Sequence, residues 1–118
     1  MNCLNLEEKM ELLHCEINAH KEVKGSILVK ENGSPISSNI SNKLHKNHKL
    51  AKSIANIFKY FNNISELQDF SFKLRDIYFH MKRIPSKKMI LTVITNSNGP
   101  PNLQKIMNHY SEAFQNIL

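Results

Sequence analysis

Side chains that could do chemistry are few in this chain of 118 residues, and they are scattered along it. Cys3, His14 and Cys15 come nearest to a set of metal ligands. His14 and Cys15 are adjacent, so on a helix they point about 100° apart and do not easily face one ion, and no further ligand pair completes a tetrahedral site. His45 and His48 fit a solvated pair on a helix surface better than a metal site. We therefore expect no metal.

Covalent and acid–base catalysis have equally little support. No acidic residue is placed to orient His14 as the base for Cys15. The acidic residues gather near the N-terminus without pairing, and the three glycines form no phosphate-binding loop. Either of the two arginines, Arg75 and Arg83, could contact a partner, although an ordinary surface cation is the simpler interpretation of each. The sequence thus predicts no catalytic residue and no cofactor, in a protein that is not an enzyme.

Charge is unevenly distributed over the sequence. The formal net charge is +6, yet residues 1–22 carry −3 and the remainder +9. The densest basic stretch contains Lys43, Lys46, Lys49 and Lys52. Such a stretch could attract an acidic protein, an anionic membrane or nucleic acid, or simply line the solvated side of a helix. Because arginine is scarce and no recognition motif is present, nucleic-acid binding is kept only as an alternative function.

Length and composition predict one cytoplasmic domain over residues 1–118. No apolar run is long enough to span a membrane, and the polar, acidic start does not resemble a secretory signal. Two cysteines cannot build a disulfide framework, which fits a reducing compartment.

Helical periodicity marks three segments. The first is expected over residues 4–19, with Asn5 as its cap and an apolar stripe of Leu6, Met10, Leu13 and Ile17. The second is expected to start between residues 41 and 47 and to end at 62 or 63, with the stripe Leu50, Ile54, Ile57, Phe58 and Phe61. The last opens at residue 101 or 102 and has the stripe Leu103, Ile106, Met107, Tyr110, Phe114 and Ile117.

Two strands are predicted around the Asn32-Gly33 dipeptide. Both residues tolerate positive φ, as a two-residue type I′ turn requires. That turn would place Val29 opposite Ile36 and Leu28 opposite Ser37. The strand over residues 25–29 is apolar on both faces and is therefore expected inside the sheet, with the second strand at an edge. Residues 37–42 are predicted to form a loop, because they are rich in serine and asparagine.

Residues 70–84 alternate in polarity and predict an antiparallel pair of strands with a turn at Arg75-Asp76. The turn would pair Leu74 with Ile77, Phe72 with Phe79 and Phe70 with Met81 on an apolar face. The opposite face would pair Lys73 with Tyr78, Ser71 with His80 and Asp69 with Lys82. Agreement on both faces supports this register, since a slip of one residue inverts every side chain.

A fifth strand over residues 89–94 is apolar throughout, as a strand buried on both faces is. It follows a break at residues 85–87. With the two doubly apolar strands placed side by side, the expected order is 2-1-5-4-3. Helices on both faces then give an α+β fold of three layers, with a five-stranded, mostly antiparallel sheet.

This pattern resembles the roadblock/dynein-light-chain family of the longin-like and profilin-like group. The residues that carry the resemblance are Lys24 to Val29 with Asn32 to Ile36, similar to the family's first hairpin. Residues 89–95 resemble its last strand and residues 102–118 its closing helix. The order of all eight elements, over residues 5–118, is the stronger part of the resemblance.

The resemblance implies a non-enzymatic adaptor or scaffold that forms homodimers or pairs with a paralogous roadblock protein, and that binds or regulates a Ras-like small GTPase. Alternatives within it are a longin-like module or a motor-complex light-chain subunit. Family dimers form along the third strand and the second helix, which here places an interface on Ile54, Ile57, Phe58, Phe61, Phe70, Phe72 and Leu74. The equally weighted alternative is that the helix residues only pack on their own sheet. Candidate partner-binding cations are Lys43, Lys46, Lys49, Lys52, Arg75 and Arg83.

Overall fold

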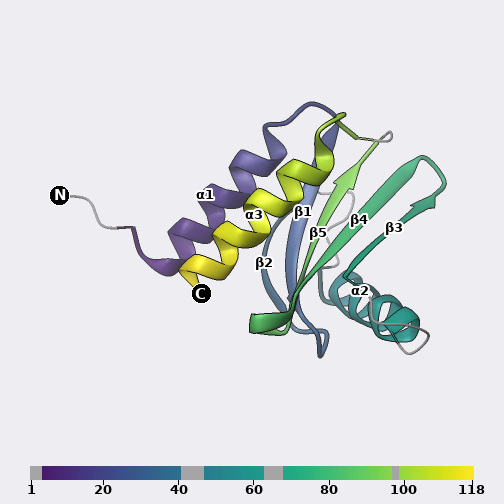
Figure 1. Cartoon of the computed structure of the whole chain (residues 1–118), viewed down its shortest axis with the longest axis horizontal. Helices are drawn as coiled ribbons and strands as arrows, with labels where there is room; N and C mark the ends of the chain where they lie inside the picture. The colour runs from purple at the N-terminus through teal and green to yellow at the C-terminus, as the bar shows by residue number, and fades with distance from the viewer. Residues whose placement is uncertain (1–3, 41–46, 63–67, 97–98) are drawn as a thin grey trace.

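A five-stranded antiparallel sheet forms the middle layer of the molecule in the computed structural model (Figure 1). The structure describes residues 4–40, 47–62, 68–96 and 99–118. In chain order the elements are α1 (Leu6–Asn18), β1 (Val23–Lys30), β2 (Pro35–Ile40), α2 (Asn47–Asn62), β3 (Asp69–Leu74), β4 (Ile77–Ile84), the short 3₁₀ helix η2 (Pro85–Lys87), β5 (Met89–Thr95) and α3 (Leu103–Ile117). The predicted order of helices and strands is confirmed.

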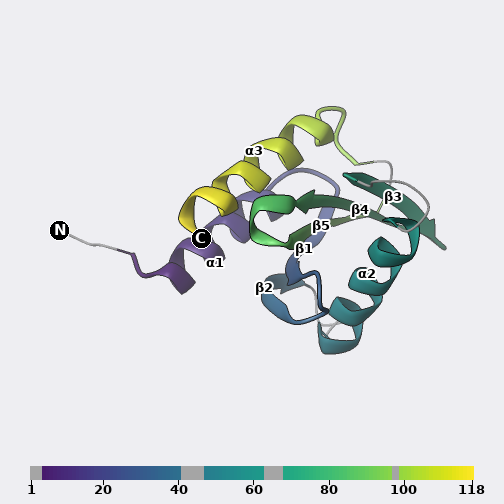
Figure 2. The same cartoon turned by 60° about the horizontal axis from the view of Figure 1, so that its bottom comes forward.

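The strands lie in the order β2-β1-β5-β4-β3, which is the order predicted. Strands β1 and β5, whose side chains are buried on both faces, occupy the interior. Helices α1 and α3 lie side by side on one face, and α2 covers the other (Figures 1 and 2). This is the predicted three-layer α+β fold.

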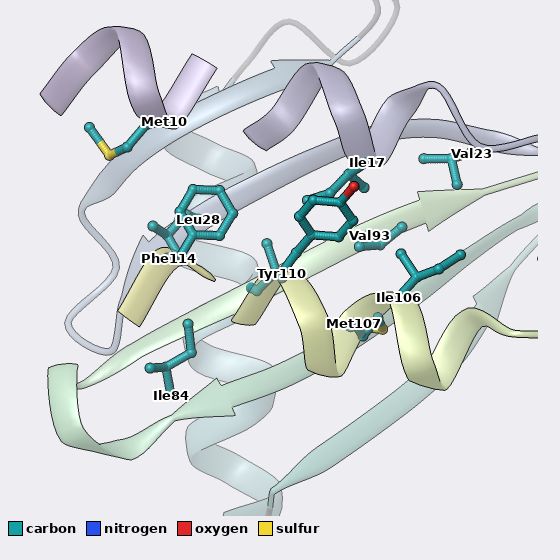
Figure 3. Packing of buried hydrophobic residues seen from close by; sticks show 11 residues of the cluster. Met10, Ile17, Val23, Leu28, Ile84, Val93, Ile106, Met107, Tyr110 and Phe114 are labelled. Atoms are coloured by element: carbon teal, nitrogen blue, oxygen red, sulfur yellow. The ribbon is translucent and has the colours of Figure 1, made fainter. Parts of the chain in front are cut away.

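Each face of the sheet has its own apolar core. On one side α1 and α3 pack over β1 and β5 through Ile17, Leu28, Val93 and Phe114, as Figure 3 shows. On the other side α2 packs on the sheet through a second set: Ile27, Val29, Ala51, Ile54, Phe58, Met81 and Ile90. The two sets explain why β1 and β5 are apolar at consecutive positions, since alternate side chains enter opposite cores.

Helix α1 begins at Leu6 because Asn5 caps it. The Asn5 side chain accepts a hydrogen bond from the Glu8 amide at 2.8 Å, and the Glu8 side chain accepts one from the Asn5 amide. This capping box satisfies two backbone donors that the first turn would otherwise leave open. The predicted cap is confirmed.

The predicted register of β3 and β4 is confirmed at all six pairs, from Asp69 opposite Lys82 to Leu74 opposite Ile77. The turn lies at Arg75-Asp76, and Arg75 takes a left-handed φ of 59°. Arginine adopts that conformation at a cost that glycine avoids. The position of the turn is therefore determined by the apolar and polar pairs on the two faces of this ribbon. The residue types in the turn do not determine it.

The predicted type I′ turn at Asn32-Gly33 is wrong, and so is the pairing of Val29 with Ile36. The Lys30 amide donates to the Ser34 carbonyl at 2.8 Å, and the Gly33 amide donates to the Lys30 carbonyl at 2.9 Å. The loop therefore has three residues, with positive φ at Gly33 and not at Asn32. Such loops carry a bulge. Leu28 still lies opposite Ser37, but Val29 lies opposite Pro35.

The loop predicted for residues 37–42 is also wrong as far as Ile40, because β2 continues to that residue. Polar groups of β2 find partners on α1. His14 Nε2 and Ser37 Oγ are 2.7 Å apart, and Asn18 Nδ2 donates to the Asn39 carbonyl at 2.8 Å. Residues 41 and 42 lie outside the described ranges.

Helix α2 starts at the last residue of its predicted range and ends at Asn62. No helix in the described part of the chain is long and apolar enough to cross a membrane.

Candidate interaction surface

Strand β3 lies at one edge of the sheet. Strand β3 pairs with β4 on one side, and no strand of the described residues pairs with its other side. An edge of this kind presents backbone N–H and C=O groups that a strand from another chain can satisfy. The β3 edge is therefore the first component of a candidate interaction surface.

Aromatic side chains form a continuous row beside this edge. The Phe61 ring of α2 lies 4.5 Å from the Phe70 ring of β3, measured between centroids, and Tyr60 contacts Phe61 edge-on at 5.2 Å. Phe72 stacks on Phe79 of β4 at 4.9 Å, with the ring planes 8° apart. The row thus joins the C-terminal end of α2 to the sheet edge.

Much of this row is exposed to solvent, and so is Leu74 at the end of β3. Tyr60 is 65%, Leu74 61% and Phe61 36% exposed, while Phe70 and Phe72 are half-buried. We call Tyr60, Phe61, Phe70, Phe72 and Leu74 the edge strip. Contiguous exposed apolar side chains around a free strand edge are typical of protein–protein interfaces.

The interface residues predicted from the sequence fall into two groups. Phe61, Phe70, Phe72 and Leu74 lie together in the edge strip. Ile54 and Phe58 are buried in the core beneath α2, and Ile57 is half-buried beside them. Tyr60 was missed, because it lies off the apolar stripe of the helix. A large aromatic residue at a solvent-facing helix position was the signal that could have found it.

The candidate cations are dispersed. Lys43 and Lys46 lie outside the described residues, whereas Lys49 and Lys52 are exposed on α2. Arg75 is exposed at the tip of the β3–β4 turn. The structure therefore does not bring all the described cations, Lys49, Lys52, Arg75 and Arg83, together as one group.

Arg83 is held in place by Glu31, a residue 52 positions away in the sequence. The Arg83 Nε donates to Glu31 Oε1 at 2.6 Å, and both side chains are more than two-thirds buried. They line a cavity of about 350 Å³ between the β1–β2 turn, α2 and the adjoining ends of β4 and β5. We call this cavity the cradle; its lining residues are Glu31, Asn32, Ala55, Phe58, Lys59, Arg83 and Ile90.

His14 lies in the interior between α1 and the sheet. Its Nδ1 is 2.8 Å from Ser26 Oγ, and its Nε2 is 2.7 Å from Ser37 Oγ. Because Ser26 Oγ donates to Asn18 Oδ1 at 3.0 Å, Ser26 accepts the Nδ1–H and Ser37 donates to Nε2. This assigns the neutral Nδ1–H tautomer. Burial lowers the His14 pKa to about 4.

His14 and Cys15 point apart, as their adjacency predicts. His14 is buried, whereas Cys15 is exposed and free. Among the described residues no group of three or more potential ligands gathers to hold a metal ion. Cys3, His45 and the His48 side chain lie outside the described part. The His14 network connects α1 to β1 and β2, and its described contacts are structural.

No family profile and no curated protein sequence matches this chain. Solved structures do match it. MglB from Myxococcus xanthus superimposes with a TM-score of 0.81 at 18% identity, covering 92% of this chain and 94% of that one. The gliding protein MglB from Thermus thermophilus gives 0.84 at 12% identity, with coverage of 99% and 93%. A roadblock/LC7 domain from Streptomyces avermitilis gives 0.75 at 10% identity, with coverage of 89% and 93%.

The chain therefore has the roadblock/LC7 fold, over nearly its whole length and that of each neighbour. The resemblance read from the hairpin, the fifth strand and the closing helix is confirmed for the fold. The particular similarity is to the MglB gliding proteins and to the roadblock/LC7 domain.

Proposed function

We propose that this chain is a non-enzymatic cytoplasmic adaptor that dimerises through the β3 edge and, as a dimer, binds a Ras-like small GTPase. The observation that carries the proposal is the open β3 edge bordered by the edge strip. It lies on the strand and helix that the roadblock resemblance assigns to the dimer interface.

Two copies of the β3 edge can satisfy each other. Antiparallel pairing of two β3 strands would continue one sheet across both subunits, and the two-fold axis would bring each edge strip beside its mate. A small domain also gains stability by sharing apolar surface that its own core cannot cover. A paralogous roadblock protein with the same edge could take the place of the second copy.

The GTPase half of the proposal is supported by the roadblock fold together with the resemblance, which implies a platform for Ras-like GTPases. Their switch segments are ordered by the γ-phosphate and released when it is hydrolysed. A platform that contacts a switch segment must therefore distinguish the two nucleotide states. The proposal assigns this chain no catalytic residue, so any effect on hydrolysis would act through the GTPase's own site.

The test is binding of the purified chain to the Ras-like GTPases of the source organism, each loaded with GDP or with a non-hydrolysable GTP analogue. We expect one of them to bind at least about tenfold more tightly in one nucleotide state, which corresponds to a modest coupling free energy. Equal binding in both states, or none, would contradict the proposal. Tight binding of an oligonucleotide with a steep loss of affinity on adding salt would favour the nucleic-acid alternative.

A further inference from the structure

The cradle combines an apolar floor with a charged rim. Phe58 and Ile90 are almost fully buried and form its floor together with Ala55. Arg83 and Glu31 stand at the rim as an ion pair, and Lys59 is exposed beside them. A cavity of about 350 Å³ lies at the small end of the range for binding pockets, which suits one large apolar group rather than an extended ligand.

Positive charge predominates around the cradle. Lys59 and Arg83 line it, against Glu31 alone. Two further lysines begin next to the β1–β2 turn: the Lys52 backbone and stem lie beside Gly33, and the Lys88 carbonyl accepts a hydrogen bond from the Glu31 amide at 3.0 Å. Helix α2 has no acidic residue between Asn47 and Asn62. Glu31 is thus the sole acid among cations from α2, β4 and the turn before β5, within the residues described. An excess of positive charge near a cavity raises the local concentration of anionic groups.

Arg83 retains donors for a further anion. Its Nε is used by Glu31, and among the described residues the two Nη groups have no hydrogen-bonding partner. The two Nη groups of a guanidinium can bind a carboxylate through two parallel hydrogen bonds. The ion pair with Glu31 fixes the guanidinium in advance, so less freedom is lost on binding.

The cradle and the edge strip lie on opposite flanks of α2. Ala55 and Lys59, four residues apart, share the flank toward the β1–β2 turn. Ile57 and Phe61 share the other flank, where Phe61 contacts Phe70 of β3. A dimer formed on the edge strip therefore leaves the flank that bears Ala55 and Lys59 facing away from that strip.

We propose that the cradle is a docking site for an acidic segment of a partner protein. One apolar side chain of the segment enters the cradle, and a neighbouring carboxylate pairs with Arg83 while others face Lys59 and Lys52. This inference rests on the proposed adaptor function, and it names the chemistry of the adaptor's partner.

The shape of the site distinguishes this occupant from two others. Membrane surfaces are bound by apolar side chains that project outward, whereas the apolar residues here are recessed in the cavity floor. Single-stranded nucleic acid stacks its bases on exposed aromatic faces, but Phe58, the one aromatic residue of the cradle, is buried. The lysines spread along α2 favour a segment with several carboxylates over a small molecule with one.

The test follows the methyl resonances of Ala55 and Ile90 during titration with short synthetic peptides. The probe has one phenylalanine between glutamates, and two control peptides replace the phenylalanine by alanine or the glutamates by lysine. We expect the probe alone to shift both resonances. Arg83→Gln should weaken binding of the probe about tenfold, because a charge-assisted pair is lost. Lys59→Gln changes an exposed side chain and leaves the core untouched, and it should weaken binding of the probe about threefold.

Lys105→Gln on α3 is the matched control, since it removes the same charge from an exposed side chain on the opposite face of the sheet. It should bind the probe like the wild type. Equal shifts with the lysine peptide, no shift with any peptide, or equal weakening by Lys105→Gln would overturn the docking site. The docking site would also be overturned if anionic vesicles or an oligonucleotide bind the wild type but not Arg83→Gln, while the peptide probe shifts neither resonance. If the wild type is monomeric and the probe still shifts both resonances, the proposed dimer is wrong and the docking site is supported.

Discussion

Acidification from pH 7 to pH 4 is expected to lower the free energy of unfolding by about 3 kcal/mol through His14 alone. In the folded chain burial lowers the His14 pKa to about 4, whereas an unfolded chain has an ordinary histidine pKa near 6.5. The unfolded state therefore takes up a proton at a pH where the native state does not. The stabilising contribution is complete above pH 6.5 and declines as the pH falls toward 4.

The physical reason is the fixed direction of the hydrogen bonds around His14. Nε2 accepts from Ser37, and a proton there would turn that acceptor into a donor inside the core. His80 adds to the effect in the same direction, because burial also lowers its pKa. Its ring nitrogens contact Ser71 and Thr95.

Urea unfolding at a series of pH values measures this contribution. His14→Gln keeps one donor and one acceptor without titrating, so its stability should fall less steeply between pH 6.5 and pH 4. His109→Gln, an exposed position on α3, should retain the wild-type slope. If His14→Gln and the wild type have parallel profiles, the assignment of the acid sensitivity to His14 is wrong.

Leu74→Lys is expected to convert the proposed dimer into monomers and to raise the dimer dissociation constant on the order of 100-fold. Leu74 lies in the edge strip and is 61% exposed, so the change costs the folded monomer little. In a two-fold dimer every substitution occurs twice, and each lysine places a charge at an apolar interface. Lysine on an edge strand is also a common way by which proteins prevent edge pairing.

Sedimentation equilibrium at several concentrations measures the change. Leu12→Lys provides the matched control, because Leu12 is 50% exposed on α1, in the layer on the other face of the sheet. That variant should keep the wild-type dissociation constant. Equal weakening by both variants would mean that added charge, not the β3 edge, controls association, and no weakening by Leu74→Lys would place the interface elsewhere.

The sequence was most informative where two independent patterns agreed. The β3–β4 register could be predicted in full because Phe70, Phe72 and Leu74 lie on one face of the ribbon and each is opposite an apolar residue of β4. The β1–β2 register could be predicted only in part, because a dipeptide that suits a two-residue turn also suits the last positions of a three-residue loop. Local residue types did not distinguish the two.

Long-range polar contacts were the main features that the sequence did not reveal. His14 binds serines that are 12 and 23 residues away, and Arg83 binds an acid 52 residues away. No spacing rule connects such positions, since they meet only after the sheet has formed. The extent of β2 was predicted too short for the same reason, because polar groups of its residues 37–39 are satisfied by side chains of α1.

The candidate site was predicted by way of the resemblance, and the structure adds its geometry. Helical periodicity could not separate Phe58, which is buried, from Phe61, which reaches the edge, because both belong to one stripe. The cradle needs the β1–β2 turn, α2 and the ends of two strands together. It was therefore not visible in any single segment.

Self-association through β3 is the central claim, and the solution mass tests it most directly. Light scattering during size exclusion, at low and at high salt, should give a mass near twice 13.7 kDa under both conditions, because the side chains of the edge strip and the backbone hydrogen-bonding groups of the β3 edge are uncharged. A mass of one chain at both salts would contradict the homodimer. A dimer that dissociates at high salt would show that charge, and not the β3 edge, holds the two copies together.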